Sequence, residues 1–565
     1  MKFKNRYSTL LNKNSLTALS GALSFFMSTH PNNSLAANKP SPDQKNIIFI
    51  ICDDLNHTQG PAAHPQTKAP NLDQLAKRGV SFINAQCNAP LCAPSRYSLT
   101  TGLYPHSLGL YEYVFIKWDK LPNASQTVPY MDFMKQNGYR VYGAGKVFHN
   151  HSEKMNAFTW PDGSDHCYSV ANWGPWPWNG THKGRSDWGW ALPHPSMPPT
   201  FSHDSSYAPL SDIPTFSPDP DKGIAGASGW WIDRNGKQHQ PFHYTNETDR
   251  DLMPDEENTK WVKTLLQGEV EEPFIISIGM NRPHAPLYAP KKYFEMFPLE
   301  TLQLPETLKN DLEDVAPDLQ RDAPNRAWGY IKYDHIINRN NCNGDNKNRW
   351  KEWLQAYLAN IAFVDDQIGK IMTALDNSPY AEDTLIIVTS DNGYHTGQKE
   401  YIHKNTLWTE SANIPMICAG PGVAQNKTCE RPVSLVDLYP TFLDYAGIKE
   451  DPYSQSARFS LAGSSLRPLL ENPEQEQWDG PPVALTEISG NPHPNYSPFI
   501  ERLSPDDFHY AVRSKNYRYI RTKNGQEELY DHRKDPYEWK NLAADPAFKG
   551  VLKYHRTQMN HVLNK

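Results

Sequence analysis

Two runs of consecutive apolar residues mark the expected core of this chain. Residues 46–52 read NIIFIIC and residues 384–390 read TLIIVTS, and both runs are rich in β-branched side chains. Continuous runs of this kind are typical of strands that are buried on both faces of a mainly parallel sheet. Asp53 and Asp54 follow the first run, and Asp391 follows the second. The carboxyl ends of parallel strands lie at the same edge of a sheet, so we expect these acidic groups to meet there. In open α/β sheets, this edge is where ligands bind.

Helical periodicity in the intervening segments predicts that helices cover this sheet. Apolar positions recur at helical spacing over residues 71–78, 131–137, 350–375 and 433–445. Further short strands are expected over residues 80–85 and 139–144. Alternating strand and helix patterns are typical of an α/β fold. We therefore expect residues 45–470 to form one domain, in which helices enclose a large mixed, mostly parallel sheet.

The pattern near the C-terminus changes from buried runs to polar–apolar alternation. Residues 510–522 read YAVRSKNYRYIRT, and residues 528–530 follow an Asn524-Gly525 turn. Alternation around an Asn-Gly turn predicts an antiparallel hairpin with one face half exposed. We expect a smaller C-terminal α+β subdomain, carrying an antiparallel sheet, over residues 471–565.

The N-terminal segment has the pattern of an export signal. It begins with four basic residues, continues with a short apolar stretch over residues 15–27, and then reaches small residues at Ser34, Ala36 and Ala37. The apolar stretch is too short to span a bilayer. This predicts a signal peptide over residues 1–37, a linker over residues 38–44, and a secreted or periplasmic protein without a membrane span. A disordered cytosolic tail is the alternative.

Composition excludes several classes of protein. The 565 residues include 56 Lys and Arg against 63 Asp and Glu, a formal net charge of −7, so a nucleic-acid binder is not expected. Aromatic residues make up 12%, which excludes a low-complexity disordered chain. The seven cysteines are too few for a disulfide framework, and their odd number leaves at least one unpaired. Cys418 and Cys429 are spaced to close a hairpin, although the sequence leaves cysteine pairing open.

Residues 158–231 form an unusual aromatic-rich insertion. They contain eight of the 16 tryptophans, interleaved with Gly, Pro, His and Asp, so regular structure is not expected. Long loops within enzymes often serve as lids or binding loops, and indole rings suit the C–H faces of sugar rings. We expect Trp176 and Trp178 to bind substrate; a loop that packs its aromatic residues against one another is the alternative.

One short motif carries the most specific chemical signal. Residues 92–96 read CAPSR and residues 101–105 read TGLYP. The further segments are GKVFH at 145–149, RPHAP at 282–286, SDNG at 390–393 and a lysine at 404. Together with the Asp53-Asp54 pair, these motifs resemble the type I, formylglycine-dependent sulfatase family of the alkaline-phosphatase superfamily over about residues 45–545. Within that family, they are most similar to iduronate-2-sulfatase and related bacterial polysaccharide sulfatases.

The resemblance implies a covalent mechanism. A maturase, a partner protein, would convert Cys92 to formylglycine (3-oxoalanine), whose gem-diol attacks sulfur to give a sulfo-enzyme intermediate. The implied catalytic residues are Cys92, Arg96, Lys146, His149, His284 and Lys404. The three cationic side chains suit sulfate oxygens. His149 is expected to act as a base, and His284, with Lys404, as the acid for the leaving group.

The same resemblance implies a metal site. The implied ligands are Asp53, Asp54, Cys92, Asp391 and Asn392. Hard oxygen donors suit Ca²⁺ or Mg²⁺ rather than zinc, and the set contains no histidine, which argues against a two-zinc phosphatase site. We expect one Ca²⁺ ion, with Mg²⁺ as the less favoured alternative. His395 and His403, which lie near Lys404, are expected either to contact substrate or to make hydrogen bonds within their loop.

These observations predict an exported sulfatase that hydrolyses sulfate esters on a carbohydrate, such as a sulfated polysaccharide or its oligosaccharides. One alternative is a phosphonate or phosphate monoester hydrolase, because relatives with the same cysteine motif perform that chemistry. A second alternative is an inactive protein that binds sulfated glycans. The complete set of catalytic side chains argues against the second alternative.

Overall fold

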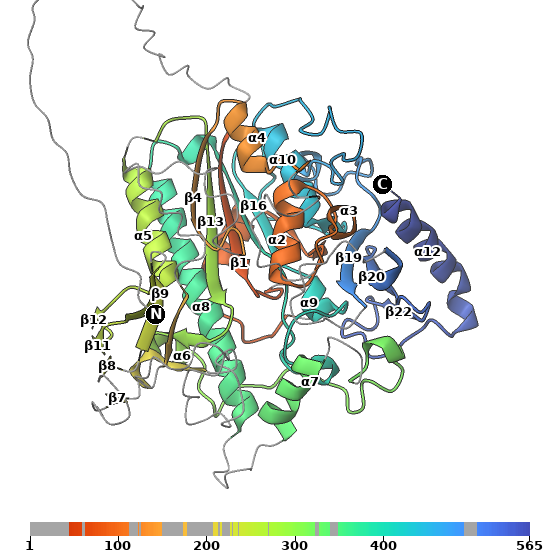
Figure 1. Ribbon diagram of the computed structural model, residues 1–565, viewed down its shortest axis with the longest axis horizontal. Coiled ribbons are helices and arrows are strands. Elements are labelled where there is room, and N and C mark those ends of the chain that lie inside the picture. The colour runs from red at the N-terminus through yellow and green to blue at the C-terminus, as the bar shows by residue number, and fades with distance from the viewer. Residues whose placement is uncertain are drawn as a thin grey trace, which may run out of the picture. The chain divides into compact units, whose positions relative to one another are not determined.

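The described part of the chain includes most of the predicted catalytic domain and C-terminal subdomain. The computed structural model describes residues 44–58, 63–111, 123, 126–149, 173–177, 207–212, 215–216, 227–228, 230–234, 237–268, 270–321, 327–338, 348–490 and 505–564. The predicted signal peptide, nearly all of the linker, Trp178 and most of the aromatic insertion lie outside these residues. Figure 1 shows the order of the helices and strands.

A seven-stranded sheet, counted over the described residues, forms the centre of the fold. In spatial order its strands are β17 (Lys427–Cys429), β2 (Gly79–Phe82), β16 (Met416–Ala419), β15 (Thr384–Ser390), β1 (Asn46–Asp53), β13 (Phe274–Pro283) and β4 (Arg140–Gly145). β1 runs parallel to its neighbours β13 and β15, and β13 runs parallel to β4. β16 is antiparallel to β15 and to β2. The sheet is therefore mixed and mostly parallel, and the predicted fold class is confirmed.

Helices cover both faces of the sheet because successive side chains of β1 point to opposite faces. Ile48 and Ile50 pack in a hydrophobic cluster with side chains of α1 (Pro70–Arg78), α5 (Pro254–Gln267) and α8 (Arg349–Asp376). Ile47 and Phe49 pack in a second cluster with side chains of α4 (Tyr130–Gln136) and α10 (Leu438–Tyr445). Figure 1 shows α5 and α8 on one side of the sheet and α4 and α10 on the other.

The first turn of α1 is capped by a carboxylate of α8. The backbone amides of Asn71 and Leu72 donate to Asp365 at 3.1 and 2.8 Å, and Asp365 is buried. Replacing Asp365 by alanine leaves these amides without their acceptor, so the free energy of unfolding should fall by about 2 kcal/mol. The Asp376→Ala variant removes an ion pair between Arg78 and Asp376, which joins the same two helices but has side chains 38% and 45% exposed. It should cost less than about 1 kcal/mol in denaturant unfolding, and equal losses for the two variants would contradict this assignment.

The prediction of a helix over residues 433–445 is wrong in its first part. Val433–Ser434 form strand β18, which pairs with β3 (Ala85–Gln86), and a 3₁₀ turn over Leu435–Asp437 leads into α10. Ser434 N donates to Asp437 Oδ2 at 2.7 Å, so a capping box begins the helical segment after the strand. The apolar residues at its start reflect burial rather than helical periodicity.

The C-terminal sheet is antiparallel, as predicted, but it is larger and more buried. Its strands in order are β19 (Ala484–Ser489), β20 (Phe508–Arg513), β21 (Tyr517–Arg521) and β22 (Glu527–Asp531). Residues 510–522 thus contribute to two strands rather than to one arm of a hairpin. One face packs on α12 (Lys549–Leu563), and the other on Leu407 and Trp408, which explains why β20 is buried along its whole length. The domain boundary at residues 470/471 stays a prediction.

Short elements complete the described part. The remaining helices are α2 (Cys92–Thr101), α3 (Pro105–Leu108), α6 (Lys291–Phe294), α7 (Ala327–Tyr333), α9 (Thr409–Ala412) and α11 (Arg467–Glu471). The small sheets pair β5 (Trp173–Pro177), β9 (Trp230–Arg234) and β10 (Lys237–Pro241); β6 (Tyr207–Pro209) and β14 (Leu287–Ala289); β7 (Thr215–Phe216) and β8 (Ala227–Ser228); and β11 (Tyr244–Asn246) and β12 (Asp249–Arg250). Cys418 and Cys429 are free thiols and do not close a hairpin. Over the described residues, no helix has the length and apolar character needed to cross a membrane.

Candidate active site

The carboxyl ends of four neighbouring strands bring the predicted site residues together. Asp53 ends β1, with Asp54 next, and Asp391 follows β15, which pairs with β1 through Cys52 and Ser390. On the other side of β1, His284 follows β13, and Lys146 follows β4. Cys92 begins α2, which lies in front of this region of the sheet in Figure 1. The strand order therefore explains why residues far apart in the sequence form one cluster.

Two unusual backbone conformations turn the chain at these strand ends. Asp54 has a φ of 63°, a left-handed conformation that Asp adopts more readily than most residues, and Tyr357 Oη donates to its carbonyl oxygen at 2.7 Å. Gly145 has a φ of 70°, and a Cβ there would lie 1.9 Å from the carbonyl oxygen of Gly279. Glycine is thus required at residue 145 for β4 to turn against β13 and present Lys146.

Cys92 is the buried centre of the cluster. Its Sγ lies 3.2 Å from Asp53 Oδ1 and 2.7 Å from Lys404 Nζ. Ligand atoms of Asp53, Asp54, Cys92 and His284 all lie within 4.8 Å of one another. Burial, followed by the charge of Asp53, raises the pKa of the Cys92 thiol. The unmodified side chain is therefore a protonated thiol at neutral pH, which is a poor nucleophile.

Three cationic side chains face three carboxylates around Cys92. Arg96 Nε and Nη2 each lie 2.8 Å from Asp391 Oδ2, and Nη2 lies 3.3 Å from Asp53 Oδ1. Lys146 pairs with Asp53, and Lys404 pairs with Asp54. The formal charges of these six groups cancel when Asp391 is ionised; burial raises the pKa of Asp391 to about 7 in the absence of a metal ion. A bound divalent cation would therefore leave the site with a charge of about +2, which suits an anionic ester.

The charge of the cluster sets the ionisation of its carboxylates. Burial opposes ionisation of Asp53, but Lys146, His284 and Arg96 hold its pKa well below the ordinary value. The pKa of Asp54 is also lowered, because Lys404 and His284 outweigh its burial. Both side chains are therefore ionised at neutral pH and available as hard oxygen ligands.

The two histidines of the cluster are neutral at pH 7. Burial lowers the pKa of His284 to about 4, and burial together with Lys146 holds the pKa of His149 well below its ordinary value. His284 Nδ1 lies 2.5 Å from the carbonyl oxygen of Ala285, which can only accept, so Nδ1 carries the proton. His284 Nε2 faces Asp54 Oδ2 at 3.7 Å and is the ring atom available to exchange a proton in the site.

The donor set fits a calcium or magnesium ion. Asn392 Nδ2 donates to Asp54 Oδ1 at 2.7 Å, whereas Asn392 Oδ1 is buried without a hydrogen-bond partner among the described residues. A buried amide oxygen beside ionised carboxylates is the kind of group that a hard cation coordinates. Asp391 also approaches the site, where its Oδ1 accepts from Asp54 N at 3.2 Å. His284 is the one member of the cluster that the predicted ligand set lacked.

The four residues predicted to contact substrate lie in different surroundings. His395 is fully buried; its Nε2 lies 2.6 Å from Thr406 Oγ1 and its Nδ1 lies 3.2 Å from the carbonyl oxygen of Gln398, which matches the alternative role within the loop. His403 is partly exposed and packs near Tyr394. The backbone of Trp176 lies in β5, and Trp178 lies outside the described residues. Substrate contact by these four residues stays a prediction.

Two residues that support His284 were missed as site residues. Asp255 of α5 accepts hydrogen bonds from the amides of Asn281 and Arg282 at 2.7 and 3.0 Å. Buried Arg282 donates to the carbonyl oxygens of His284 at 3.0 Å and of Gly174 in β5 at 2.9 Å. Arg282 thus joins the loop of His284 to the aromatic insertion. The RPHAP motif marked Arg282, but no local signal marks Asp255, because its role depends on how α5 packs against β13.

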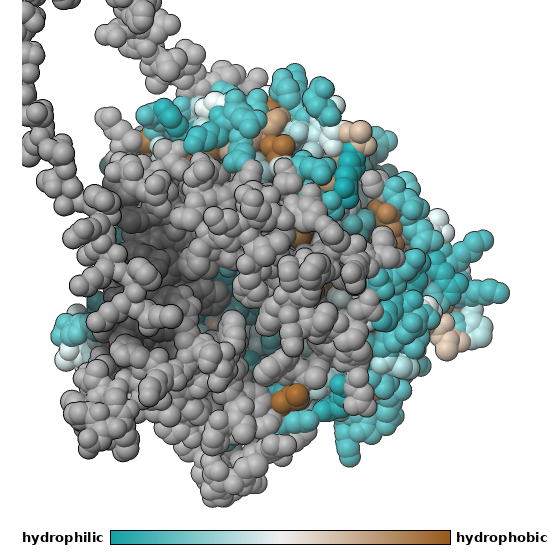
Figure 2. Space-filling view, viewed as in Figure 1, coloured by the Kyte–Doolittle hydropathy of each residue, from teal (hydrophilic) through white to brown (hydrophobic). Residues whose placement is uncertain are grey.

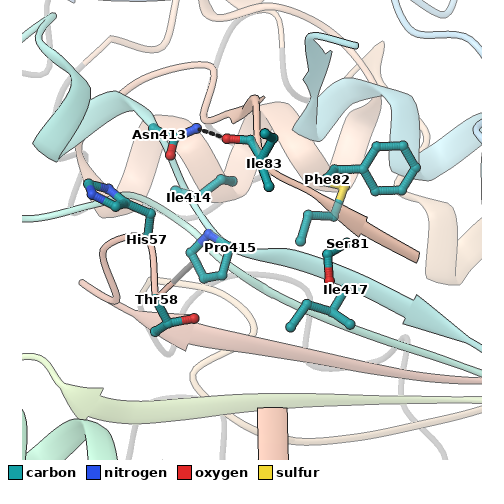
Figure 3. A pocket seen from close by; sticks show the side chains of 10 residues that line it. His57, Thr58, Ser81, Phe82, Ile83, Asn413, Ile414, Pro415 and Ile417 are labelled. Carbon is teal, nitrogen blue, oxygen red and sulfur yellow. Dashed lines mark hydrogen bonds between the residues drawn. The ribbon is translucent and has the colours of Figure 1, made fainter. Parts of the chain in front are cut away.

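A separate small pocket is lined in part by residues of β2 and β16 and does not include the charged cluster. Its lining includes His57, Ser81, Asn413 and Ile417 (Figure 3). Asn413 Nδ2 donates to the carbonyl oxygen of Ile83 at 3.1 Å on one wall. The lining contains none of the residues of the Cys92 cluster, so this pocket is distinct from the candidate site.

Comparison with known proteins identifies the family. The family model described as Sulfatase matches residues 45–448, which is more than half of the chain. The chain belongs to the sulfatase family. A second family model, described as N-sulphoglucosamine sulphohydrolase, C-terminal, matches residues 397–565. This sulfatase is a sulfuric ester hydrolase, and members of its family generally use a formylglycine and a divalent metal ion.

Individual relatives agree with this assignment. The chain is 30% identical over 527 residues to a sulfatase of Formosa agariphila, covering 90% of this chain and 85% of that protein. It is 25% identical to mouse (Mus musculus) iduronate 2-sulfatase, covering 86% of each chain. Two solved structures show the same fold: a 2-O GAG sulfatase (TM-score 0.58, 20% identity, 92% of each chain covered) and the phosphonate monoester hydrolase of Agrobacterium radiobacter (TM-score 0.62, 21% identity, 92% and 96% covered).

Proposed function

We propose that this sulfatase hydrolyses sulfate esters on a carbohydrate, with Cys92 converted to formylglycine and one Ca²⁺ ion held beside it. The observation that carries the proposal is the position of Cys92. Its protonated thiol is unsuited to attack, yet it lies among ionised carboxylates and three cationic side chains. Hydrated formylglycine at this position would supply a hydroxyl nucleophile, which the thiol itself cannot provide.

The chain's own residues have distinct tasks in this reaction. Asp53, Asp54, Asp391 and Asn392 would hold the Ca²⁺ ion, which would neutralise charge on the sulfate group. Lys146 and Lys404 would bind and orient sulfate oxygens as point charges, and Arg96 fixes Asp391 and Asp53 beside residue 92 through its planar guanidinium.

Proton transfer falls to the histidines. The hydroxyl of residue 92 that attacks sulfur must release a proton; His284 Nε2, which is unprotonated at pH 7, would take up this proton and give it to the departing alkoxide, with Lys404 beside it. His149, which is neutral at pH 7, accepts the proton that must leave residue 92 when the aldehyde is restored. These roles agree with the ring-nitrogen assignment for His284.

The names of the relatives support a carbohydrate substrate. A relative of 26% identity in Formosa agariphila is an ulvan-active sulfatase, and a solved structure of the same fold holds D-glucosamine-2-N,6-O-disulfate as substrate. We propose a sulfated polysaccharide or its oligosaccharides as the substrate class. A sulfate-release screen over algal polysaccharides and glycosaminoglycan oligosaccharides tests this, and hydrolysis of aryl sulfate without release from any carbohydrate would contradict it.

A phosphonate or phosphate monoester hydrolase is the second candidate. The structural similarity to a phosphonate monoester hydrolase, with a TM-score of 0.62, favours it. Initial rates on aryl sulfate, aryl phosphate and aryl phosphonate esters distinguish the two reactions. We expect the sulfate ester to react fastest, because the family model and the relatives of 25–30% identity are named sulfatases.

We also propose export and maturation. The basic and apolar pattern of residues 1–37 supports a cleaved signal peptide and a secreted or periplasmic location. The CAPSR motif supports recognition of Cys92 by a formylglycine-generating maturase. N-terminal sequencing of the exported protein tests cleavage near Ala37, and an intact N-terminus in the exported protein would contradict it.

The aromatic insertion should bind the sugar chain rather than the sulfate. It contains Trp176 in β5, and Arg282 joins β5 to the loop of His284. A Trp176→Ala variant should raise KM for a sulfated oligosaccharide about fivefold and leave turnover of a small aryl sulfate nearly unchanged, since loss of one stacked ring weakens binding alone. Tyr554→Ala, on exposed α12, is the control and should alter neither substrate. Equal losses on both substrates would show that Trp176 is part of the core packing.

A further inference from the structure

The catalytic Lys404 lies on a segment that is held by charged groups at both ends. We call residues 397–409 the Lys404 loop. Lys404 Nζ lies 2.7 Å from Cys92 Sγ, and Asn405 N donates to the carbonyl oxygen of Pro90 at 2.8 Å. Lys399 and Asn405 have φ values of 54° and 73°, left-handed conformations that persist only when surrounding contacts impose them. The position of the Lys404 ammonium group therefore depends on what holds this loop.

The C-terminal subdomain holds the end of the loop that follows Lys404. The Glu538 carboxylate accepts from Thr409 N at 2.9 Å and from Thr409 Oγ1 at 2.8 Å. Arg518 of β21 donates to Glu538 Oε1 at 2.6 Å and to the carbonyl oxygen of Leu407 at 3.1 Å. Both charged side chains are buried, at 1% and 0% exposure. The remaining Arg518 nitrogens donate to Leu407, Gln86 and Thr409, and a buried, charge-assisted network of this kind fixes geometry more tightly than a surface ion pair does.

The same subdomain also reaches the start of the loop. The buried Lys399 ammonium group donates to Asp311 Oδ1 at 2.7 Å and also to the backbone carbonyl of Glu538. At the other end of the loop, Trp408 Nε1 donates to Glu528 Oε2 of β22 at 2.9 Å. Glu538 thus contacts the loop on both sides of Lys404, through its side chain and through its backbone. Lys404 is five residues from each of these two contacts.

We propose that the Glu538–Arg518 pair is a positioning device for Lys404. By fixing Leu407, Thr409 and Lys399, the pair sets the ammonium group beside residue 92 and the leaving-group oxygen. Glu538 and Arg518 are positioning residues, because they act through the loop and not on substrate. This inference rests on the proposed function, in which Lys404 stabilises the departing group.

A double-mutant cycle tests the inference. Glu538→Gln keeps the shape of the side chain but removes its charge, and we expect kcat to fall about tenfold on an aryl sulfate with a poor leaving group, with little change in KM. The loss should be smaller for an activated leaving group, which needs less assistance. In the Lys404→Ala background, Glu538→Gln should cost less than about twofold, because the group it positions is gone. Similar losses in the two backgrounds would overturn the proposal.

Control variants separate positioning from folding. Glu527→Gln breaks the more exposed ion pair with Arg556 in the same subdomain. It should leave kcat unchanged on aryl sulfates with poor and with activated leaving groups. If Glu538→Gln does not fold, judged by circular dichroism, Thr409→Val removes one hydroxyl contact to Glu538 and should show the same leaving-group dependence at smaller size. An equal loss on all leaving groups with Thr409→Val would also overturn the proposal. This inference alone fails if the wild-type enzyme releases sulfate and Lys404→Ala abolishes that activity but Glu538→Gln does not. If the matured wild-type enzyme releases no sulfate, the proposed function fails and this inference fails with it.

Discussion

A Cys92→Ala variant should lose sulfate-ester hydrolysis by a factor of about 10³ or more while keeping its fold. The side chain at residue 92 lies between Asp53 and Lys404, so its replacement removes the nucleophile and leaves the surrounding charges in place. Initial rates on an aryl sulfate measure the loss, and circular dichroism reports the fold. The matched control is Cys418→Ala, which removes another buried free thiol from β16 and should keep nearly full activity. Substantial activity in Cys92→Ala would contradict the assignment of the nucleophile.

An Asp54→Ala variant should lose both metal binding and turnover. Asp54 accepts from Asn392 at 2.7 Å and pairs with Lys404, so its removal takes away one hard ligand and leaves an ammonium group beside the vacated position. Turnover should fall by about 10³-fold, since the remaining oxygen donors would hold Ca²⁺ weakly. In the wild-type protein, Ca²⁺ should raise Tm and a chelator should remove the activity reversibly.

A control variant and two possible outcomes test the predicted metal site. Asp376→Ala removes an exposed carboxylate far along α8 and should leave calcium binding unchanged. Calorimetry with Ca²⁺ measures binding independently of activity. An Asp54→Ala variant that binds Ca²⁺ with wild-type affinity would contradict the ligand set, and full activity after complete chelation would contradict the need for a metal.

The centre of the sheet and part of the site could be predicted from local pattern. The runs at 46–52 and 384–390 are continuous and β-branched, so they mark strands buried on both faces, and the structure pairs them directly. Carboxylates placed after two adjacent parallel strands must meet at one edge. This pattern predicts that Asp53, Asp54 and Asp391 lie together; in the structure Arg96 contacts Asp53 and Asp391, and Asp54 N donates to Asp391.

Other features depend on tertiary packing that no local pattern encodes. The apolar run FIISI of β13 marks a strand by the same pattern, but nothing in that run indicates that the strand lies between β1 and β4. Asp255 supports the loop of His284 through two backbone amides, so its own sequence context gives no signal. The start of α10 was misplaced because Val433 and Ser434 are buried by pairing with β3. The sequence leaves both roles of His395 open, because its burial depends on Tyr401 and Trp408, whose rings pack beside it.

The chemical state of residue 92 tests the central claim most directly. Protein should be prepared with graded levels of a formylglycine-generating maturase, and peptide mass should give the fraction of residue 92 in which SH₂ has been replaced by oxygen. Each preparation is then assayed for sulfate release under the same conditions with Ca²⁺ present. The account predicts that the rate is proportional to the oxidised fraction and falls to nearly zero with unmodified Cys92. A rate that does not depend on this fraction, or full activity with only the thiol present, would contradict the account.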